Sequence, residues 1–113
     1  MDELIVESTK YVVKCLVNED YEAIEIFTQG IRATKDDIRQ MIQDYGKTLI
    51  FPPKEAFEED LNIIAVENSD MPKYSVYFHL WTKEEGMSDL SLELTVIFED
   101  NECKVELDDI HVL

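Results

Sequence analysis

The sequence predicts an α+β fold in which N-terminal helices pack on one face of a curved, mainly antiparallel sheet of four to five strands. Apolar residues recur at helical spacing in the first half of the chain and alternate with polar residues in the second half. Helices followed by consecutive strands are typical of a layered α+β domain rather than of a βαβ sheet. With 113 residues, the chain is expected to form one domain over residues 1–113.

The helical part of the chain carries both start and stop signals. Asp2, Asp20 and Thr34 are expected N-caps, because their side-chain oxygens can accept hydrogen bonds from the free amides of a first turn. Gly30 and Gly46 suit the left-handed position that ends a helix. The helices are expected at about residues 3–17, 21–28 and 35–45, and Pro53 can open one further helical turn through Phe57.

Alternation of apolar and polar residues predicts the strands, expected at about residues 48–51, 61–67, 74–82, 90–98 and 103–112. In the last three strands the alternation sorts Leu92 and its apolar companions onto one face, and His79 onto the other. After Asp108 the apolar phase slips by one residue, to Ile110 and Val112. A slip of this kind predicts a β-bulge at Asp108-Asp109, which keeps the apolar side chains inside.

The turns at residues 83–89 and 99–102 set a register between these strands. The expected apolar pairs are Phe78 with Leu94, and Val96 with Val105. On the polar face the register builds three rows: Tyr77, Thr95 and Glu106; His79, Glu93 and Asp108; and Trp81, Ser91 and His111. Because the helices are expected to cover the apolar face, this polar face is the candidate binding surface. Its residues are Tyr77, His79, Trp81, Glu93, Thr95, Glu106, Asp108 and His111.

The charge is strongly negative and unevenly spread. The formal net charge is −16; residues 1–54 carry ten acids and seven bases, whereas residues 55–113 carry sixteen acids and three bases. Such a surface repels nucleic acid and anionic lipid and attracts a basic protein. We therefore expect no nucleic acid and no membrane partner, and a basic protein is the partner that fits. The plainer alternative is that the acids serve solubility.

Location and redox state follow from what the sequence lacks. It contains no apolar run long enough to cross a bilayer, and its first residues are acidic where a signal peptide is basic. We therefore expect a cytoplasmic protein. Cys15 and Cys103 form no CxxC pair, so they are expected to be reduced thiols rather than a disulfide or zinc ligands.

The four groups His79, Glu93, Asp108 and His111 are the one constellation suited to chemistry. A histidine between carboxylates can act as a general base, and such a set can also hold a metal. No spaced catalytic, nucleotide-binding or calcium-binding motif accompanies them. We therefore expect no catalytic residue, no metal ligand and no cofactor, and favour the view that His79 relieves repulsion between acids on a solvated face.

Several segments resemble an uncharacterised bacterial domain family, a domain of unknown function. They are Tyr-Gly-Lys-Thr-Leu at 45–49, Pro-Pro-Lys-Glu-Ala-Phe at 52–57, Tyr-Ser-Val-Tyr-Phe-His-Leu-Trp-Thr-Lys-Glu-Glu-Gly at 74–86, and the closing Asp-Asp-Ile-His-Val-Leu. The resemblance spans most of the chain and implies no residue roles. More loosely, the order of helices and curved sheet is similar to cystatin-like and nuclear-transport-factor-like folds, which host unrelated functions.

The leading interpretation is a non-enzymatic protein-binding module, in its sharper form an immunity-type protein that neutralises a basic toxin. The alternative is a small-molecule-binding or enzymatic domain of nuclear-transport-factor-like type. That alternative needs a ligand between the curved sheet and the helices, with His79 and Glu93 as contacts. A third interpretation is a homodimer joined through the face that carries Tyr77, Trp81 and Ile97.

Overall fold

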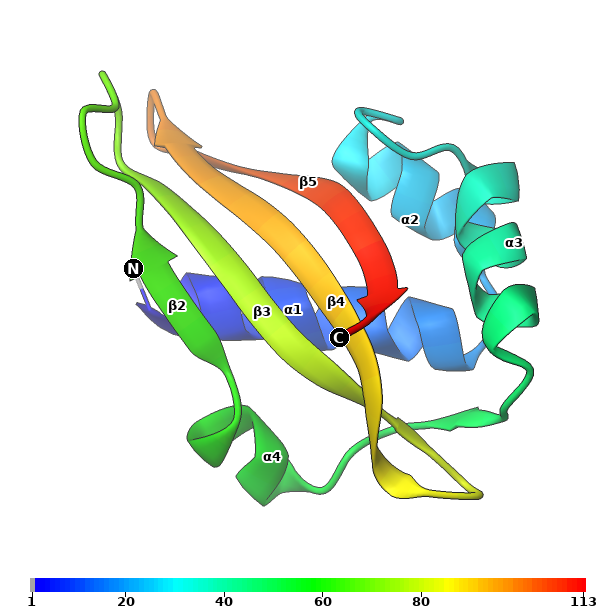
Figure 1. Cartoon of the computed structure of the whole chain (residues 1–113). Coiled ribbons are helices and arrows are strands. Elements are labelled where there is room, and N and C mark those ends of the chain that lie inside the picture. The colour runs from blue at the N-terminus through cyan, green and yellow to red at the C-terminus, as the bar shows by residue number, and fades with distance from the viewer. Residues whose placement is uncertain (1) are drawn as a thin grey trace.

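The computed structural model describes residues 2–113 and has the α+β architecture that the sequence predicts. Within these described residues, four helices and five strands follow one another, with the helices mainly N-terminal (Figure 1). In chain order they are α1 (Asp2–Val17), α2 (Tyr21–Thr28), α3 (Lys35–Tyr45), β1 (Leu49–Ile50), α4 (Lys54–Glu59), β2 (Asn62–Ala65), β3 (Lys73–Thr82), β4 (Gly86–Glu99) and β5 (Glu102–Val112).

The five strands form one antiparallel sheet. The strand order is β1-β3-β4-β5, and β2 also pairs with β3. Figure 1 shows α1 crossing behind the sheet, and α2 and α3 lying beyond β5. The opposite face, turned toward the viewer, is left open by all the helices of residues 2–113.

The helix ends follow the capping chemistry. Thr34 and Asp37 form a capping box at the start of α3: the Thr34 hydroxyl accepts from the Asp37 amide at 3.3 Å, and the Asp37 carboxylate accepts from the Thr34 amide at 3.0 Å. The hydrogen bond that the Asp37 carboxylate accepts from the Thr34 amide is the main cause of the lowered pKa of Asp37. Asp20 caps α2, and Gly46 ends α3 with a φ of 74°. Asp2 is already helical, rather than the expected cap of α1.

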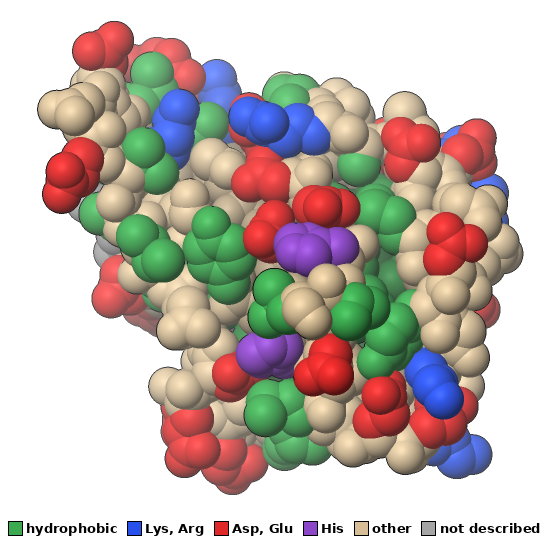
Figure 2. All heavy atoms as spheres, in the orientation of Figure 1, with side chains coloured by type: hydrophobic (Ala, Val, Ile, Leu, Met, Phe, Trp, Pro, Cys, Tyr) green, Lys and Arg blue, Asp and Glu red, His purple; other side chains and the backbone are tan. Residues whose placement is uncertain are grey.

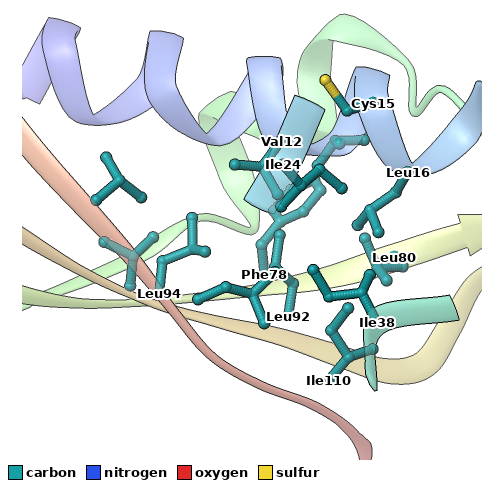
Figure 3. Packing of buried hydrophobic residues seen from close by; sticks show 14 of the residues in the cluster. Val12, Cys15, Leu16, Ile24, Ile38, Phe78, Leu80, Leu92, Leu94 and Ile110 are labelled. Atoms are coloured by element: carbon teal, nitrogen blue, oxygen red, sulfur yellow. The ribbon is translucent and has the colours of Figure 1, made fainter. Parts of the chain in front are cut away.

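The hydrophobic core fills the space between the sheet and the helices. Leu92 of β4 is 0% exposed and Phe78 of β3 is 1% exposed, and Figure 3 shows both beneath the apolar side chains of the helices. The Phe57 ring of α4 stacks on Phe78, with centroids 4.7 Å apart and planes 10° from parallel. Helical side chains that are at most 1% exposed in the core include Ile5, Val12, Leu16, Ile24 and Ile38.

The register between β3 and β4 differs from the prediction by two residues. Phe78 pairs with Leu92, not with Leu94. The cause is an irregularity near the turn: His79 pairs with Ser91 but Trp81 pairs with Met87, so three residues of β4 face one of β3. The Ser88 hydroxyl stabilises this irregularity by donating to the Leu80 carbonyl oxygen at 2.6 Å. Strand β4 accordingly begins at Gly86, four residues before the expected start.

The register between β4 and β5 agrees with the prediction on both sides of the bulge, but within the bulge Glu93 pairs with Asp109 instead of Asp108. Val96 pairs with Val105, which confirms the expected pair. Leu94 pairs with Leu107 whereas Glu93 pairs with Asp109, so Asp108 is the extra residue. The register shift of two residues between β3 and β4 leaves every side chain on its predicted face, because side chains alternate with a period of two. In β5 the bulge adds one residue, which restores the predicted face after Asp108. The apolar and polar side chains of all three strands therefore separate onto opposite faces.

We predict that the substitution Leu92→Ala lowers the free energy of unfolding by about 2–5 kcal/mol, since it opens a cavity in the packed core. The matched control is Ile64→Ala in β2, where the side chain is 55% exposed on the other face. The control should cost less than about 1 kcal/mol. Urea denaturation measures both, and equal losses would contradict the assignment of the two faces.

Candidate protein-binding face

All eight residues of the predicted binding surface are partly exposed. The residues that alternate with them are buried, from Val76 to Leu80 in β3 and from Leu90 to Val96 in β4. Figure 2 shows both histidines on the open face, each beside carboxylate side chains. We call this surface the open face. Its role in binding stays a prediction, but its separation from the core is a feature of the fold.

The rows across the open face differ from the predicted rows. Tyr77 pairs with Glu93 instead of Thr95, and Glu93 pairs in turn with Asp109 instead of Asp108. The pairing of Thr95 with Glu106 is as predicted. His79, Ser91 and His111 form a row of their own, and Trp81 lies outside it, opposite Met87. The four-residue constellation of His79, Glu93, Asp108 and His111 is therefore divided among three neighbouring groups.

The first group joins His79 to Asp60, the residue that follows α4. The His79 ring nitrogen Nδ1 lies 3.2 Å and 3.3 Å from the two carboxylate oxygens of Asp60. The His79 backbone amide also donates to Asp60 Oδ2 at 3.4 Å. This contact ties the end of α4 to β3, and it was missed by the sequence analysis because Asp60 lies outside any periodic segment.

The second group joins His111 to two carboxylates. Its Nδ1 lies 3.2 Å from Asp109 Oδ2, and its Nε2 lies 3.9 Å from Glu93 Oε1. Nδ1 is nevertheless buried without a hydrogen bond to any described residue, so the contact with Asp109 is one of proximity alone. The spacing of apolar residues predicts a bulge at Asp108-Asp109 but assigns Asp108, not Asp109, to the row with Glu93.

Arg32, in the loop between α2 and α3, reaches across β5 to the open face. Its Nε lies 3.0 Å from Asp108 Oδ1 and 3.4 Å from Glu106 Oε1. The Thr95 hydroxyl donates to the other Asp108 oxygen at 2.6 Å. Asp108 is thus held by a hydrogen bond on one side and an ion pair on the other, although its Oδ1 makes no hydrogen bond within residues 2–113. The ion pair places the loop between α2 and α3 against the sheet. Nothing in the sequence pattern indicates Arg32, because a loop residue has no periodicity.

Trp81 packs partly against the hydrophobic core, although its position in the alternating pattern predicts a place on the open face. Its ring packs against the hydrophobic core and approaches Gly86, where an added Cβ would lie 3.8 Å from Cζ3. Its Nε1 is buried and has no hydrogen-bond partner among residues 2–113. Gly86 needs its left-handed φ of 74° at the turn. Trp81 therefore supports the end of the sheet more than it offers a contact surface.

Five carboxylates on or beside the open face form what we call the acidic cluster: Asp60, Glu93, Glu106, Asp108 and Asp109. Their side chains are between 18% and 49% exposed. Within the described part of the chain, Arg32 is the one lysine or arginine that forms an ion pair with any of them. The cluster therefore keeps an excess of negative charge that a cation or a cationic side chain can reach.

A hollow beside the open face is too small for an ordinary small-molecule site. It measures about 230 Å³ and lies between α3 and the end of β5, where Met41, Tyr45 and His111 line part of it. Small-molecule sites usually measure about 300–1,000 Å³. This hollow therefore gives no support to a ligand pocket that uses His111.

Comparison with known protein families shows to which family the chain belongs. The model of a family described as a domain of unknown function (DUF7668) matches residues 13–113. The chain belongs to this family. The expected membership of a family without an assigned activity is thereby confirmed. No curated protein and no solved structure matches the chain. None of the helices in residues 2–113 is both long and apolar enough to cross a membrane.

We predict that Thr95→Val lowers the free energy of unfolding by about 1 kcal/mol, because it leaves the Asp108 carboxylate without its shortest hydrogen bond. The control is Ser75→Ala on the cross-strand partner of Thr95. The Ser75 hydroxyl has no side-chain hydrogen bond within residues 2–113, so this change should be nearly neutral. Thermal and urea unfolding measure both, and a neutral Thr95→Val would contradict the role of Asp108 as a fixed bridge.

Proposed function

We propose that this domain is a non-enzymatic protein-binding module whose open face binds a basic protein. The observation that carries the proposal is the acidic cluster. Five carboxylates lie on or beside one uncovered face of the sheet, and among the described lysines and arginines Arg32 alone forms an ion pair with any of them. Complementary charge of this kind speeds docking and selects partners. The net charge of −13 carried by residues 55–113 extends the negative electrostatic field beyond the cluster.

The contacts within the cluster favour binding over idle solvation. Thr95 and Arg32 fix Asp108, and His79 fixes Asp60, so these carboxylates lose little freedom when a partner binds. Apolar surface lies beside them: Ile64 is 55% exposed, and Tyr77 is partly exposed next to Glu93. A partner can therefore bury apolar area while its lysines or arginines meet the carboxylates.

In its sharper form, the proposal is that the domain is an immunity-type protein that masks a basic toxin in the cytoplasm. A toxin that acts on nucleic acid carries a cationic surface, and such a surface is complementary to the acidic cluster. The support is charge and the open face alone. The class of partner is therefore the part that the experiment has to decide.

The small-molecule alternative needs His79 and Glu93 between the sheet and the helices. Both residues lie on the open face, and the space between sheet and helices is filled by the core around Phe78 and Leu92 (Figure 3). A homodimer through Tyr77, Trp81 and Ile97 meets two obstacles: Trp81 is engaged with the core, and each chain carries a charge of −16. Light scattering tests the homodimer, and we expect a mass near 13.2 kDa for the isolated chain.

The test is affinity capture from the native host at low salt, followed by mass spectrometry and titration calorimetry of the captured partner with the wild-type chain. A triple variant, Glu106→Gln, Asp108→Asn and Asp60→Asn, should weaken binding at least about tenfold, since it removes three charges that face the partner. The control variant, Glu3→Gln, Glu22→Gln and Glu55→Gln, removes the same number of charges from exposed helical positions.

A basic partner lost in the first variant, kept in the control and released by added salt is the expected result. Equal loss in both variants would reduce the proposal to a nonspecific effect of net charge. Failure to capture any basic protein at low salt would contradict it.

A further inference from the structure

We infer that Glu93, Asp109 and His111 form a binding site for one divalent transition ion of the zinc class. The three side chains come from the adjacent strands β4 and β5 and lie on the open face. They offer one ligand atom each, and these atoms all lie within 4.8 Å of one another. No other group of three or more potential metal ligands of this kind occurs in residues 2–113.

The distances suit an ion after a small closure of the side chains. Zinc binds imidazole nitrogen and carboxylate oxygen at about 2.0–2.2 Å, so neighbouring ligand atoms around it lie roughly 3.4 Å apart. His111 approaches the two carboxylates with different ring nitrogens: Nδ1 lies 3.2 Å from Asp109 Oδ2, and Nε2 lies 3.9 Å from Glu93 Oε1. Because a single nitrogen would bind the ion, side chains have to turn so that one nitrogen faces both carboxylates, starting from ligand atoms within 4.8 Å of one another. All three side chains are partly exposed, so their rotation, with the strands in place, would bring the three groups onto one ion.

The electrostatics of the site supply an independent reason to expect a cation. Glu93 and Asp109 are direct cross-strand partners, and like charges in that position repel one another. In the described chain neither carboxylate forms an ion pair with a lysine or arginine, because Arg32 is engaged with Glu106 and Asp108. Beside them, His111 Nδ1 is buried and has no hydrogen bond. A bound cation would neutralise the carboxylate pair and give an imidazole nitrogen a partner.

The bulge at Asp108 creates this arrangement. In a regular strand, Asp109 would lie on the same face as Leu107, toward the core. The extra residue instead places Asp109 opposite Glu93 and His111 opposite Ser91, both on the open face. Bulges commonly redirect a side chain at functional positions in this way.

The donor set selects the class of ion. An imidazole nitrogen favours zinc, copper, iron or nickel, whereas magnesium and calcium prefer all-oxygen sites. Three protein ligands leave further positions to water, as in open zinc sites. His79 lies in the same cross-strand row as His111, on the far side of Ser91, but its Nδ1 is already next to Asp60. His79 is therefore the natural control.

The site does not depend on the proposed protein partner, and its test uses the isolated chain. The metal-free full-length protein is titrated with Zn²⁺ by calorimetry, and the two histidine rings are followed by ¹H–¹⁵N NMR. We expect one Zn²⁺ per chain, a shift of the His111 ring signals with those of His79 unchanged, and no comparable effect of Mg²⁺. The variants His111→Ala and Asp109→Asn should each weaken Zn²⁺ binding at least about tenfold, whereas His79→Ala should leave it unchanged.

The NMR titration of the unmodified chain keeps the test decisive even if a variant folds poorly. The variant Cys103→Ser removes the more accessible thiol and should not change Zn²⁺ binding. The inference is overturned if no Zn²⁺ binds at about 100 µM, if binding shifts His79 instead of His111, or if binding is lost with Cys103→Ser and kept with His111→Ala. Capture of a protein partner, or failure to capture one, has no bearing on these outcomes.

Discussion

The rest of the structure depends on the bulge at Asp108. Leu107 and Ile110 must both point into the core, yet they are three residues apart, and a regular strand cannot turn both inward. The two residues between them are aspartates, and burial of an unpaired carboxylate is costly. The extra residue resolves the conflict, because it keeps Leu107 opposite Leu94 and sends both acids to the open face.

This local solution concentrates charge. Glu106, Asp108 and Asp109 now share one face of one strand, opposite Thr95 and Glu93 on the next. Arg32 compensates two of these acids from a neighbouring loop, and the remainder is left for a partner or an ion. Fold and function are thereby connected: the core requires the bulge, the bulge gathers the acids, and the helices leave that face uncovered (Figures 1 and 2).

Local periodicity was sufficient to predict the α+β fold, the two faces and the bulge, because each depends on the spacing of apolar residues such as Leu107 and Ile110. It could not predict the shift between β3 and β4, which rests on a hydrogen bond from Ser88 to the Leu80 carbonyl. Nor could it find Arg32 or Asp60, since loop residues reach the sheet only through the tertiary fold. Periodicity therefore predicts the correct face but incorrect cross-strand rows, with Asp108 opposite Glu93 where the structure has Asp109.

Membership of a family of unknown function leaves the open face as the feature to be explained, and the pairing of β4 with β5 is its foundation. The most direct test is the pattern of nuclear Overhauser effects between backbone protons of these strands. The account predicts contacts between Leu94 and Leu107, and between Glu93 and Asp109, with Asp108 left out of the ladder. Regular contacts of Glu93 with Asp108 would contradict it, because Asp109 would then face the core and would be lost from the acidic cluster of the open face.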